Sequence, residues 1–379
     1  MWVERLQLGE FRRFQNAGIE PAPGLNLITG RNGAGKTSVL EALHVMAYGR
    51  SFRGRVRDGL IRDGKEAIEV FVQWRESRQP VSDSTCAADA KGADAGISRK
   101  AGIRHTGQAW TGKLDGMPVT HLGELCAALA VVTFEPGSHA LVNGGGEPRR
   151  RFLDWGLFHV EQDFLSLSRR YARALKQRNA LLKSGAGASM LDVWDRELAE
   201  AGEPLTRRRQ VYVERIQTRA VALAATLAPS LGLRDMDFVP GWRRHEMSLA
   251  DALLLARDRD RQMGHTSVGP HRGDWNVGFQ VIPGRDALSR GQAKLTALAC
   301  LMAQAEDYAL QRGDWPVIAL DDLASELDRE HQQRVLAWLC AHPAQVFVTA
   351  TELPQSMLEM EREGQLQVFH VEHGSVDRR

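Results

Sequence analysis

Apolar and polar positions along the chain follow two different periods. Leu6 and Leu8 alternate with polar neighbours, which predicts a strand with one exposed face. Short continuous apolar runs are typical of buried strands, whereas residues 149–261 show the wider spacing of helices. The predicted strands lie at 25–29, 68–74, 127–134, 316–320 and 345–349. This order predicts an α/β fold that is built from both ends of the chain and split by a helical insertion.

The same pattern places the boundaries of these parts. We expect an α/β lobe at 1–140 and 262–379, and a compact, mainly helical lobe at 141–261. Within the first lobe, residues 77–102 are rich in Ser, Ala, Gly and Asp and contain almost no large apolar side chains. Such a segment cannot bury enough apolar surface to offset the entropy lost on ordering, so we expect a flexible hairpin loop rather than a functional one.

A glycine-rich segment joins the predicted strand at 25–29 to a segment with helical spacing at 38–46. It has the pattern G-x-x-x-x-G-K-T between a strand and a helix, which is the context that a phosphate-binding loop requires. In such a loop the backbone N–H groups face phosphate oxygens, Lys36 would neutralise the β and γ phosphates, and Thr37 would bind Mg²⁺. A tight glycine turn without a ligand is the alternative. The residues expected to bind nucleotide here are Gly30, Arg31, Asn32, Gly33, Ala34, Gly35, Lys36 and Thr37.

A second candidate element is the strand at 316–320, which ends in two acids. In an enzyme with a phosphate loop, Asp321 would bind Mg²⁺ and Asp322 would orient the attacking water. A helix N-cap that follows a strand would also explain an acid at this point. Lys36 and Asp322 are therefore candidate catalytic residues, and Thr37 and Asp321 are candidate metal ligands.

Composition limits the classes of protein that fit. The 379 residues carry a formal net charge of +2, with 43% hydrophobic and 25% charged residues, as in an ordinary globular protein. The four cysteines are scattered, which favours reduced thiols over a zinc site or a disulfide framework. The first residues are too charged for a secretory signal, and the apolar stretch at 220–233 is too short to span a bilayer. We therefore expect a cytoplasmic protein that makes no membrane contact.

Because the net charge is small, any nucleic-acid surface must come from local basic clusters. Residues 164–183 contain several Lys and Arg and no acid, with apolar side chains at helical spacing on the other face, and residues 50–65 and 149–151 form further clusters. Such patterns are also typical of solvated surfaces. Contacts made by these clusters would be with phosphates and independent of base sequence. The DNA-binding candidates are Arg169, Arg170, Arg173 and Lys176 in the first cluster, and Arg53 and Arg55 in the second.

Four segments follow one another in an order that resembles the ATP-binding cassette ATPases. They lie at 30–37, 288–292, 318–322 and 325–328. Within these ATPases the chain is similar to the branch that contains the SMC proteins and the RecF family. The further segments that carry this similarity are 10–14, 49–53, 143–155, 176–182 and 267–272. The resemblance covers nearly the whole chain and implies an ATPase head of mixed sheets and helices with an inserted helical lobe.

The resemblance also implies a function that composition and spacing do not show. Cassette ATPases form head-to-tail dimers, so Ser289, Gly291 and Gln292 of one copy would complete the ATP and Mg²⁺ site formed around Lys36 of the other. RecF-like proteins act on single-stranded and double-stranded DNA at gaps and stalled forks, in replication, recombinational repair and the SOS response. They cooperate with the RecO and RecR mediators to load RecA.

The chain departs from the cassette pattern at three places. Asp322 stands where many relatives have Glu, so we expect slow hydrolysis, with ATP acting mainly as a dimer clamp. No His follows the strand at 345–349, and Thr349 or Thr351 would replace it. Residues 134–136 lie near the place of the usual glutamine loop, and Gln73 is not expected to serve in it.

Three other functions share some of these features. A small-molecule or nucleotide kinase also uses a phosphate loop, but it would have no use for the segments at 288–292 and 325–328. A long SMC-type tether would need sustained heptads, whereas a helical insertion of this length gives arms of only about 75 Å. A transporter ATPase subunit would not explain the helical insertion and the basic clusters.

Overall fold

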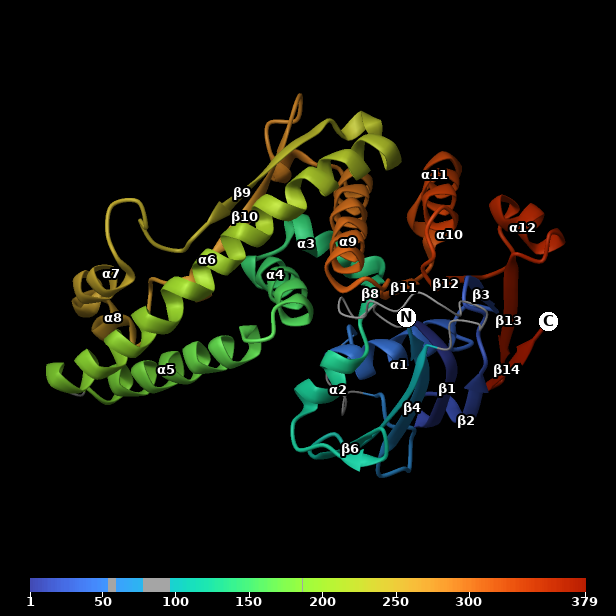
Figure 1. Ribbon diagram of the computed structural model, residues 1–379, viewed down its shortest axis with the longest axis horizontal. Coiled ribbons are helices and arrows are strands. Elements are labelled where there is room, and N and C mark those ends of the chain that lie inside the picture. The colour runs from blue at the N-terminus through green and yellow to red at the C-terminus, as the bar shows by residue number, and fades with distance from the viewer. Residues whose placement is uncertain (54–58, 78–95, 186) are drawn as a thin grey trace, which may run out of the picture. The chain divides into compact units, whose positions relative to one another are not determined.

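The computed structural model describes residues 1–53, 59–77, 96–185 and 187–379, which form two compact units. Unit 1 comprises Met1–Gly137 and Gln304–Arg379, and unit 2 comprises Ser138–Ala303 (Figure 1). The predicted fold class is confirmed. The units differ from the predicted lobes mainly at residues 262–303, which belong to unit 2 because β10 (Asp274–Phe279) pairs there with β9 (Leu233–Val239).

A mostly parallel sheet forms one layer of unit 1. Its strand order is β14-β13-β3-β12-β11-β8, in which β14 pairs antiparallel with β13 and the other pairs are parallel. The strands β3, β8, β11 and β12 are buried at every position, which is typical of a parallel sheet covered on both faces. The strand bounds are β3 (Leu25–Thr29), β8 (Val131–Phe134), β11 (Val317–Leu320), β12 (Val346–Ala350), β13 (Leu366–Glu372) and β14 (Ser375–Arg378).

An antiparallel sheet forms the second layer of unit 1. Its strand order is β2-β1-β4-β5-β6-β7. The alternation at Leu6 and Leu8 is confirmed, because both side chains are buried in the core of unit 1. The strand bounds are β1 (Trp2–Phe11), β2 (Phe14–Ile19), β4 (Ile68–Glu76), β5 (Ile97–His105), β6 (Trp110–Leu114) and β7 (Met117–Pro118).

The predicted loop at 77–102 is wrong at its C-terminal end, where β5 begins at Ile97. Residues of β5 pair along β4 from Glu76 to Ile68, so tertiary pairing rather than apolar content makes this segment a strand. The rest of the predicted loop, at 78–95, lies outside the described residues.

Helix α1 (Lys36–Tyr48) lies between the two sheets of unit 1 (Figure 1). It contacts β1 and β4 of the antiparallel sheet and β8 and β12 of the parallel sheet. Its residues are buried on nearly every side, as expected for a helix enclosed by two layers. The first turn of α1 is thereby held rigidly at the carboxyl end of β3, where the glycine-rich segment begins.

The other helices of unit 1 are short. They are α2 (Leu122–Ala128), α10 (Leu323–Glu326), α11 (Arg329–Cys340) and α12 (Leu358–Arg362). The predicted strand at 127–134 is wrong at its start, because α2 ends at Ala128 and β8 begins at Val131.

Unit 2 is mainly helical. Its longest helix, α6, has 40 residues and is about 60 Å long at the usual rise. The predicted run of helices over 149–261 is wrong at 233–239, where β9 packs on α6 and pairs with β10. Helix α9 begins in unit 2 and ends in unit 1. The helix bounds are α3 (Ala140–Asn143), α4 (Gly146–Val160), α5 (Phe164–Ser184), α6 (Ala188–Leu227), α7 (Leu249–Leu255), α8 (Arg257–Met263) and α9 (Arg290–Arg312).

Candidate functional site

The glycine-rich segment forms a tight loop between β3 and α1. Lys36 is the first residue of α1, and its Nζ atom donates hydrogen bonds to the carbonyl oxygens of Gly30 and Arg31 at 2.8 and 3.2 Å. Gly30 and Gly35 have φ angles of 148° and 119°, which residues with side chains rarely adopt. A Cβ atom on Gly30 would also stand 2.4 Å from the carbonyl oxygen of Val371. The loop therefore requires glycine at these positions.

Lys36 lies close to both acids that follow β11. Its side chain is nearly buried, with 8% of its surface exposed. Burial lowers the pKa of the Lys36 ammonium group, and the charges of Asp322 and Asp321 oppose that shift. The fold therefore brings together candidate residues from near the two ends of the chain.

Asp321 and Thr37 also lie side by side. Asp321 is 2% exposed, and burial raises the pKa of its carboxyl group. Hydrogen bonds from the hydroxyls of Thr349 and Thr37 oppose that rise. A hydroxyl and a carboxylate, together with phosphate oxygens, are the hard oxygen ligands that Mg²⁺ prefers. The residues present therefore fit this ion.

Asp322 joins β11 to α10 in a left-handed backbone conformation, with φ 54° and ψ 38°. Its N–H donates to Oγ1 of Thr349 at 2.8 Å, and its carboxylate accepts a hydrogen bond from the Ser325 hydroxyl at 2.9 Å. Asp322 is also the N-cap residue of α10, as the alternative interpretation holds. Within the described chain, however, its carboxylate makes no capping bond to the helix backbone. The helix backbone therefore does not engage the Asp322 carboxylate, which can take a role other than capping.

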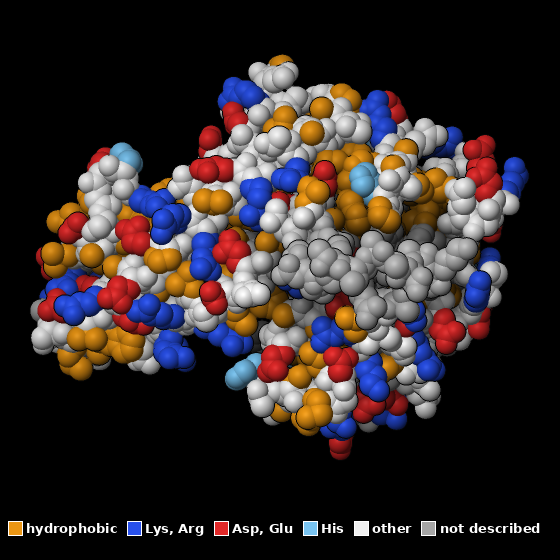
Figure 2. All heavy atoms as spheres, viewed as in Figure 1, with side chains coloured by type: hydrophobic (Ala, Val, Ile, Leu, Met, Phe, Trp, Pro, Cys, Tyr) orange, Lys and Arg blue, Asp and Glu red, His pale blue; other side chains and the backbone are white. Residues whose placement is uncertain are grey.

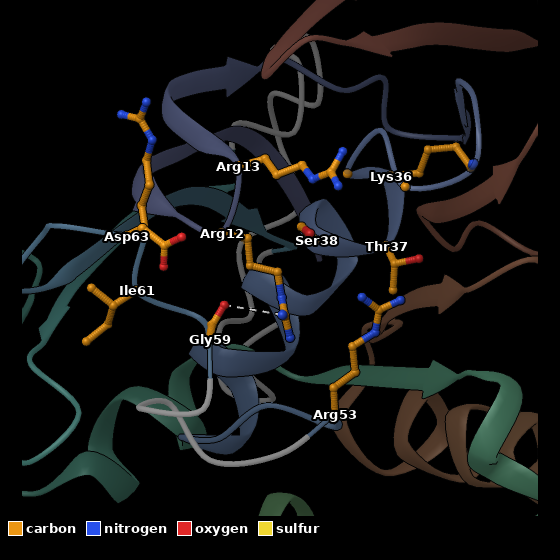
Figure 3. Close-up of a pocket in the computed structure, with 12 residues that line it drawn as sticks. Arg12, Arg13, Lys36, Thr37, Ser38, Arg53, Gly59, Ile61 and Asp63 are labelled. Atoms are coloured by element: carbon orange, nitrogen blue, oxygen red, sulfur yellow. Dashed lines mark hydrogen bonds between the residues drawn. The ribbon is translucent and has the colours of Figure 1, made fainter.

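A cavity of 720 Å³ opens in unit 1 beside the glycine-rich loop. Figure 3 shows that Arg13 points toward Lys36 and that Arg53 points toward Thr37. Arg53 also lies near enough to Asp321 for its charge to act on that carboxylate. Arg53 was expected on a DNA-binding surface, whereas the structure places it in this cavity. The cavity is basic and borders the loop, so it suits a polyphosphate.

Arg12 and Arg13 line this cavity and were not among the predicted site residues. The Arg12 guanidinium donates two hydrogen bonds to the Glu41 carboxylate of α1, at 2.5 and 2.7 Å. This pair fixes the β1–β2 turn on α1. The adjacent Arg13 consequently lies over the loop, 3.8 Å from where a Cβ atom on Gly33 would stand. The two consecutive arginines at 10–14 were the signal that could have identified them.

The predicted signature segment at 288–292 lies in unit 2, at the start of α9. The Ser289 N–H donates to Oε1 of Gln292 at 2.9 Å, and the Gln292 N–H donates to Oγ of Ser289 at 3.2 Å. This reciprocal pair is a capping box, in which two local hydrogen bonds stabilise the first turn of a helix. Ser289, Arg290 and Gly291 are exposed. The segment therefore presents a helix N-terminus at the surface of unit 2.

The basic candidates on α5 fall into two groups. Arg169, Arg173 and Lys176 are exposed and lie at positions i, i+4 and i+7, which share one face of a helix. Arg170 is also exposed, but it donates to two glutamates of α6 at 2.7 to 2.8 Å. Its charge is therefore already balanced locally. Arg55 lies outside the described residues.

Two arginines of the basic segments are interior residues of unit 2. Arg178 of α5 is 0% exposed and donates to Asp195 at 2.5 Å and to Asp260 at 2.7 Å. Arg149 of α4 is 2% exposed and donates to both carboxylate oxygens of Asp274, at 2.5 and 2.9 Å. Buried charges need such partners, so both arginines hold the fold together and do not reach a ligand.

The segments considered for a glutamine loop and a phosphate sensor contain Gln73, Glu135 and Thr351. Gln73 lies within β4 and donates to Glu4 at 3.1 Å, in keeping with its exclusion from the site. The Glu135 carboxylate accepts a hydrogen bond from the Gly137 N–H at 2.5 Å, within its own turn. Thr351 is exposed.

Among the helices that the structure describes, none is both long and apolar enough to cross a membrane.

The sequence matches the family model described as the RecF/RecN/SMC N terminal domain over residues 2–377. A protein of Stenotrophomonas maltophilia named DNA replication and repair protein RecF is 68% identical, over 99% of both chains. A protein of the same name from Shewanella baltica is 34% identical, also over 99% of both chains.

Solved structures agree on the fold. The structure of a recombination mediator protein RecF with ATP, described as part of the RecFOR pathway, has a TM-score of 0.84 and 24% identity, over 100% of this chain and 97% of that one. An Smc head bound to the winged-helix domain of ScpA has a TM-score of 0.57 and 15% identity, over 100% of this chain and 97% of that one. The chain therefore belongs to the RecF family, within the wider family of RecF/RecN/SMC N-terminal domains.

Proposed function

We propose that this chain is an ATP-dependent DNA-binding protein of recombinational repair and replication-fork maintenance, in which ATP clamps two copies together and is hydrolysed slowly. The observation that carries the proposal is the convergence of Lys36, Thr37, Asp321 and Asp322 at one edge of the parallel sheet of unit 1. The relatives named DNA replication and repair protein support the biological role, and the solved relative with ATP supports the nucleotide.

The geometry supports distinct roles for these residues. The N–H groups of residues 30–37 and the Lys36 ammonium group bind the β and γ phosphates, and Arg13 and Arg53 extend this positive lining. Thr37 and Asp321 hold Mg²⁺, which neutralises charge on the phosphates when it is bound. Asp322 orients the attacking water. The adenosine part of ATP occupies the rest of the cavity.

Slow hydrolysis follows from the side chain at 322. The Asp322 carboxylate is one methylene shorter than the Glu of many relatives, and the Ser325 hydroxyl binds one of its oxygens. Both features hold the carboxylate back from the γ phosphate. ATP binding therefore controls the association of two copies, and hydrolysis ends it.

The second half of each ATP site comes from another copy of the chain. Ser289, Gly291 and Gln292 lie at an exposed helix N-terminus, whose dipole favours an anion. In a head-to-tail dimer this segment binds the γ phosphate held by the partner's loop. ATP is thereby enclosed between the two copies.

DNA binds to the basic face of α5 in this proposal. Arg169, Arg173 and Lys176 share that face, and Arg170 contributes less because it is paired with α6. Figure 2 shows Lys and Arg side chains interspersed with acids over the part of unit 2 that contains α5. A row of three exposed cations on one helix face suits the phosphates of single-stranded or double-stranded DNA and a salt-sensitive affinity. RecO, RecR and RecA are the protein partners that family membership supports.

The proposal is tested with two variants that break opposite halves of the ATP site. Lys36→Ala removes the phosphate-binding ammonium, and Ser289→Arg blocks the exposed segment. Each variant alone should stay monomeric with ATP by light scattering and should not hydrolyse it. Mixing the two leaves one intact site in each heterodimer, so hydrolysis should return to at most half of the native rate.

The native chain should form a dimer with ATP but not with ADP or without nucleotide, and gapped DNA should strengthen that dimer. Its single-turnover hydrolysis should be slow. A monomer that transfers phosphate to a small molecule would instead support the kinase alternative. A mixture of two folded variants that regains no activity would exclude the shared site.

A further inference from the structure

The hydroxyl of Thr349 connects both acids of the proposed ATP site. Thr349 lies in β12, the neighbour of β11, and is 0% exposed. Its Oγ1 atom donates a hydrogen bond to Oδ1 of Asp321 at 2.7 Å and accepts one from the N–H of Asp322 at 2.8 Å. A hydroxyl has a single hydrogen, and Asp321 receives it. Thr349 therefore has no proton left to donate to a phosphate.

The backbone of Asp322 needs such support. Its left-handed conformation, with φ 54°, is disfavoured for a residue with a side chain and persists only where neighbouring groups enforce it. Four hydrogen bonds do so here. The Asp322 N–H donates to Thr349, the Asp322 carbonyl accepts from the N–H groups of Ser325 and Glu326 at 2.9 and 3.1 Å, and the Ser325 hydroxyl holds the Asp322 carboxylate. The contact to Thr349 is the one that ties this turn to the neighbouring strand.

We propose that Thr349 is a positioning residue, which aims the Asp321 carboxylate at the metal and fixes the backbone from which the Asp322 carboxylate reaches the water. This inference rests on the proposed ATP hydrolysis. It assigns Thr349 a role through the two acids, in place of the direct contact with the γ phosphate that the sequence suggested. It also assigns Ser325, which lies in the 325–328 segment, the role of holding the Asp322 carboxylate of its own chain.

Thr349→Val tests the assignment because valine has nearly the same shape without the hydroxyl. The change leaves Asp321 Oδ1 buried without this donor and the Asp322 N–H without its acceptor. Losing a hydrogen bond to a charged group corresponds to about a 10- to 100-fold effect. We therefore expect kcat for ATP hydrolysis to fall by about 10- to 100-fold, with little change in the affinity for ATP measured without Mg²⁺.

A second readout does not depend on turnover. The fluorescence of a labelled ATP analogue bound to the full chain is titrated with Mg²⁺, and the concentration at half-maximal change reports how well the Asp321 carboxylate is aimed. Thr349→Val should raise that concentration by about tenfold. Thr349→Ser keeps the hydroxyl and should restore both the Mg²⁺ titration and kcat.

Thr111→Val is the matched control, since it makes the same change on an exposed strand threonine of unit 1, in β6, that lies outside the proposed ATP site. It should leave both readouts at native values. If Thr349→Val does not fold, Thr349→Cys, a weaker donor of similar size, is compared with Thr349→Ser in its place. Native Mg²⁺ and kcat values in a folded Thr349→Val or Thr349→Cys variant would overturn the assignment. An absence of hydrolysis in the native chain would instead refute the proposed ATPase, and the Mg²⁺ titration would still test Thr349.

Discussion

Replacing Arg178 with methionine should destabilise unit 2 without removing a DNA contact. Arg178 belongs by sequence to the basic segment of α5, but its side chain is 0% exposed. It donates to Asp195 at 2.5 Å, to Asp260 at 2.7 Å and to Oγ1 of Thr266 at 3.0 Å. Methionine fills a similar volume but provides no charge. Two buried carboxylates would then lose the cation that they share.

The size of the stability loss depends on which hydrogen-bond donors remain around each carboxylate. Asp195 keeps a second partner, because Arg257 approaches it at 2.7 Å. Among the described residues, Asp260 keeps neutral donors such as the Ser267 N–H at 3.0 Å. Leaving a buried charge without its partner costs about 3–5 kcal/mol. For a unit of this size that corresponds to a fall in melting temperature of about 6–20 °C. Most of the loss is expected to come from Asp260.

Circular dichroism melts of the full chain measure this effect, and Arg173→Met is the matched control. Arg173 lies on the exposed face of the same helix, so its replacement should change stability by no more than about 0.5 kcal/mol. The double variant Arg178→Met/Asp260→Asn removes the unpaired charge and should recover most of the lost stability. DNA affinity is compared at a temperature below all of these melts.

The two variants should behave in opposite ways. Arg178→Met should melt early and bind DNA with native affinity, and Arg173→Met should melt normally and bind DNA more weakly. If Arg178→Met melted like the native chain and lost DNA affinity to the same extent as Arg173→Met, Arg178 would be a surface contact, and the reasoning from burial would be refuted.

Two further predictions concern DNA binding and pH. Replacing Arg169, Arg173 and Lys176 together with alanine should reduce the slope of log affinity against log salt by up to about 2.7 for duplex DNA. Arg170→Ala should reduce that slope by less, because Arg170 already pairs with α6. Titrations between about 50 and 200 mM salt measure both slopes. An unchanged slope in the triple variant would exclude this face of α5. His44 of α1 is buried against Thr133 and Tyr48, and burial lowers its pKa to about 3. The unfolded chain therefore binds the proton first as pH falls from about 6.5 toward 3, so this group should reduce stability by up to about 1.4 kcal/mol per pH unit over that range. Melts of His44→Gln should show a shallower loss of stability in the same range, and identical pH profiles would contradict the assignment.

The parts of the site that could be predicted are those with a local signal. The loop at 30–37 needs glycine for its backbone and a strand and helix on either side, and all of these are adjacent in sequence. The strand ending in Asp321 and Asp322 is likewise continuous. Because the carboxyl ends of parallel strands share one edge of a sheet, the two segments meet once the strands pair through β12. Fold class and family followed from such segments.

The parts that could not be predicted depend on which face of an element is covered. Arg173 and Arg178 stand in the same basic helix, and the burial of one follows from carboxylates of α6 and α8 that sequence spacing does not reveal. β5 escaped prediction for a related reason, because its pairing with β4 overrides its low apolar content.

Thr349 shows why the positioning groups of the site are harder to find than its ligands. The sequence suggested Thr349 only as a direct contact to the γ phosphate, because it stands 28 positions after Asp321 and nothing in that spacing indicates their hydrogen bond. Only the register of β11 against β12 brings its hydroxyl to the two acids. The motifs therefore supply the groups that touch phosphate and metal, since ligand chemistry restricts those residue types. The groups that aim them are restricted only by geometry, so a strand neighbour can take that role without any motif.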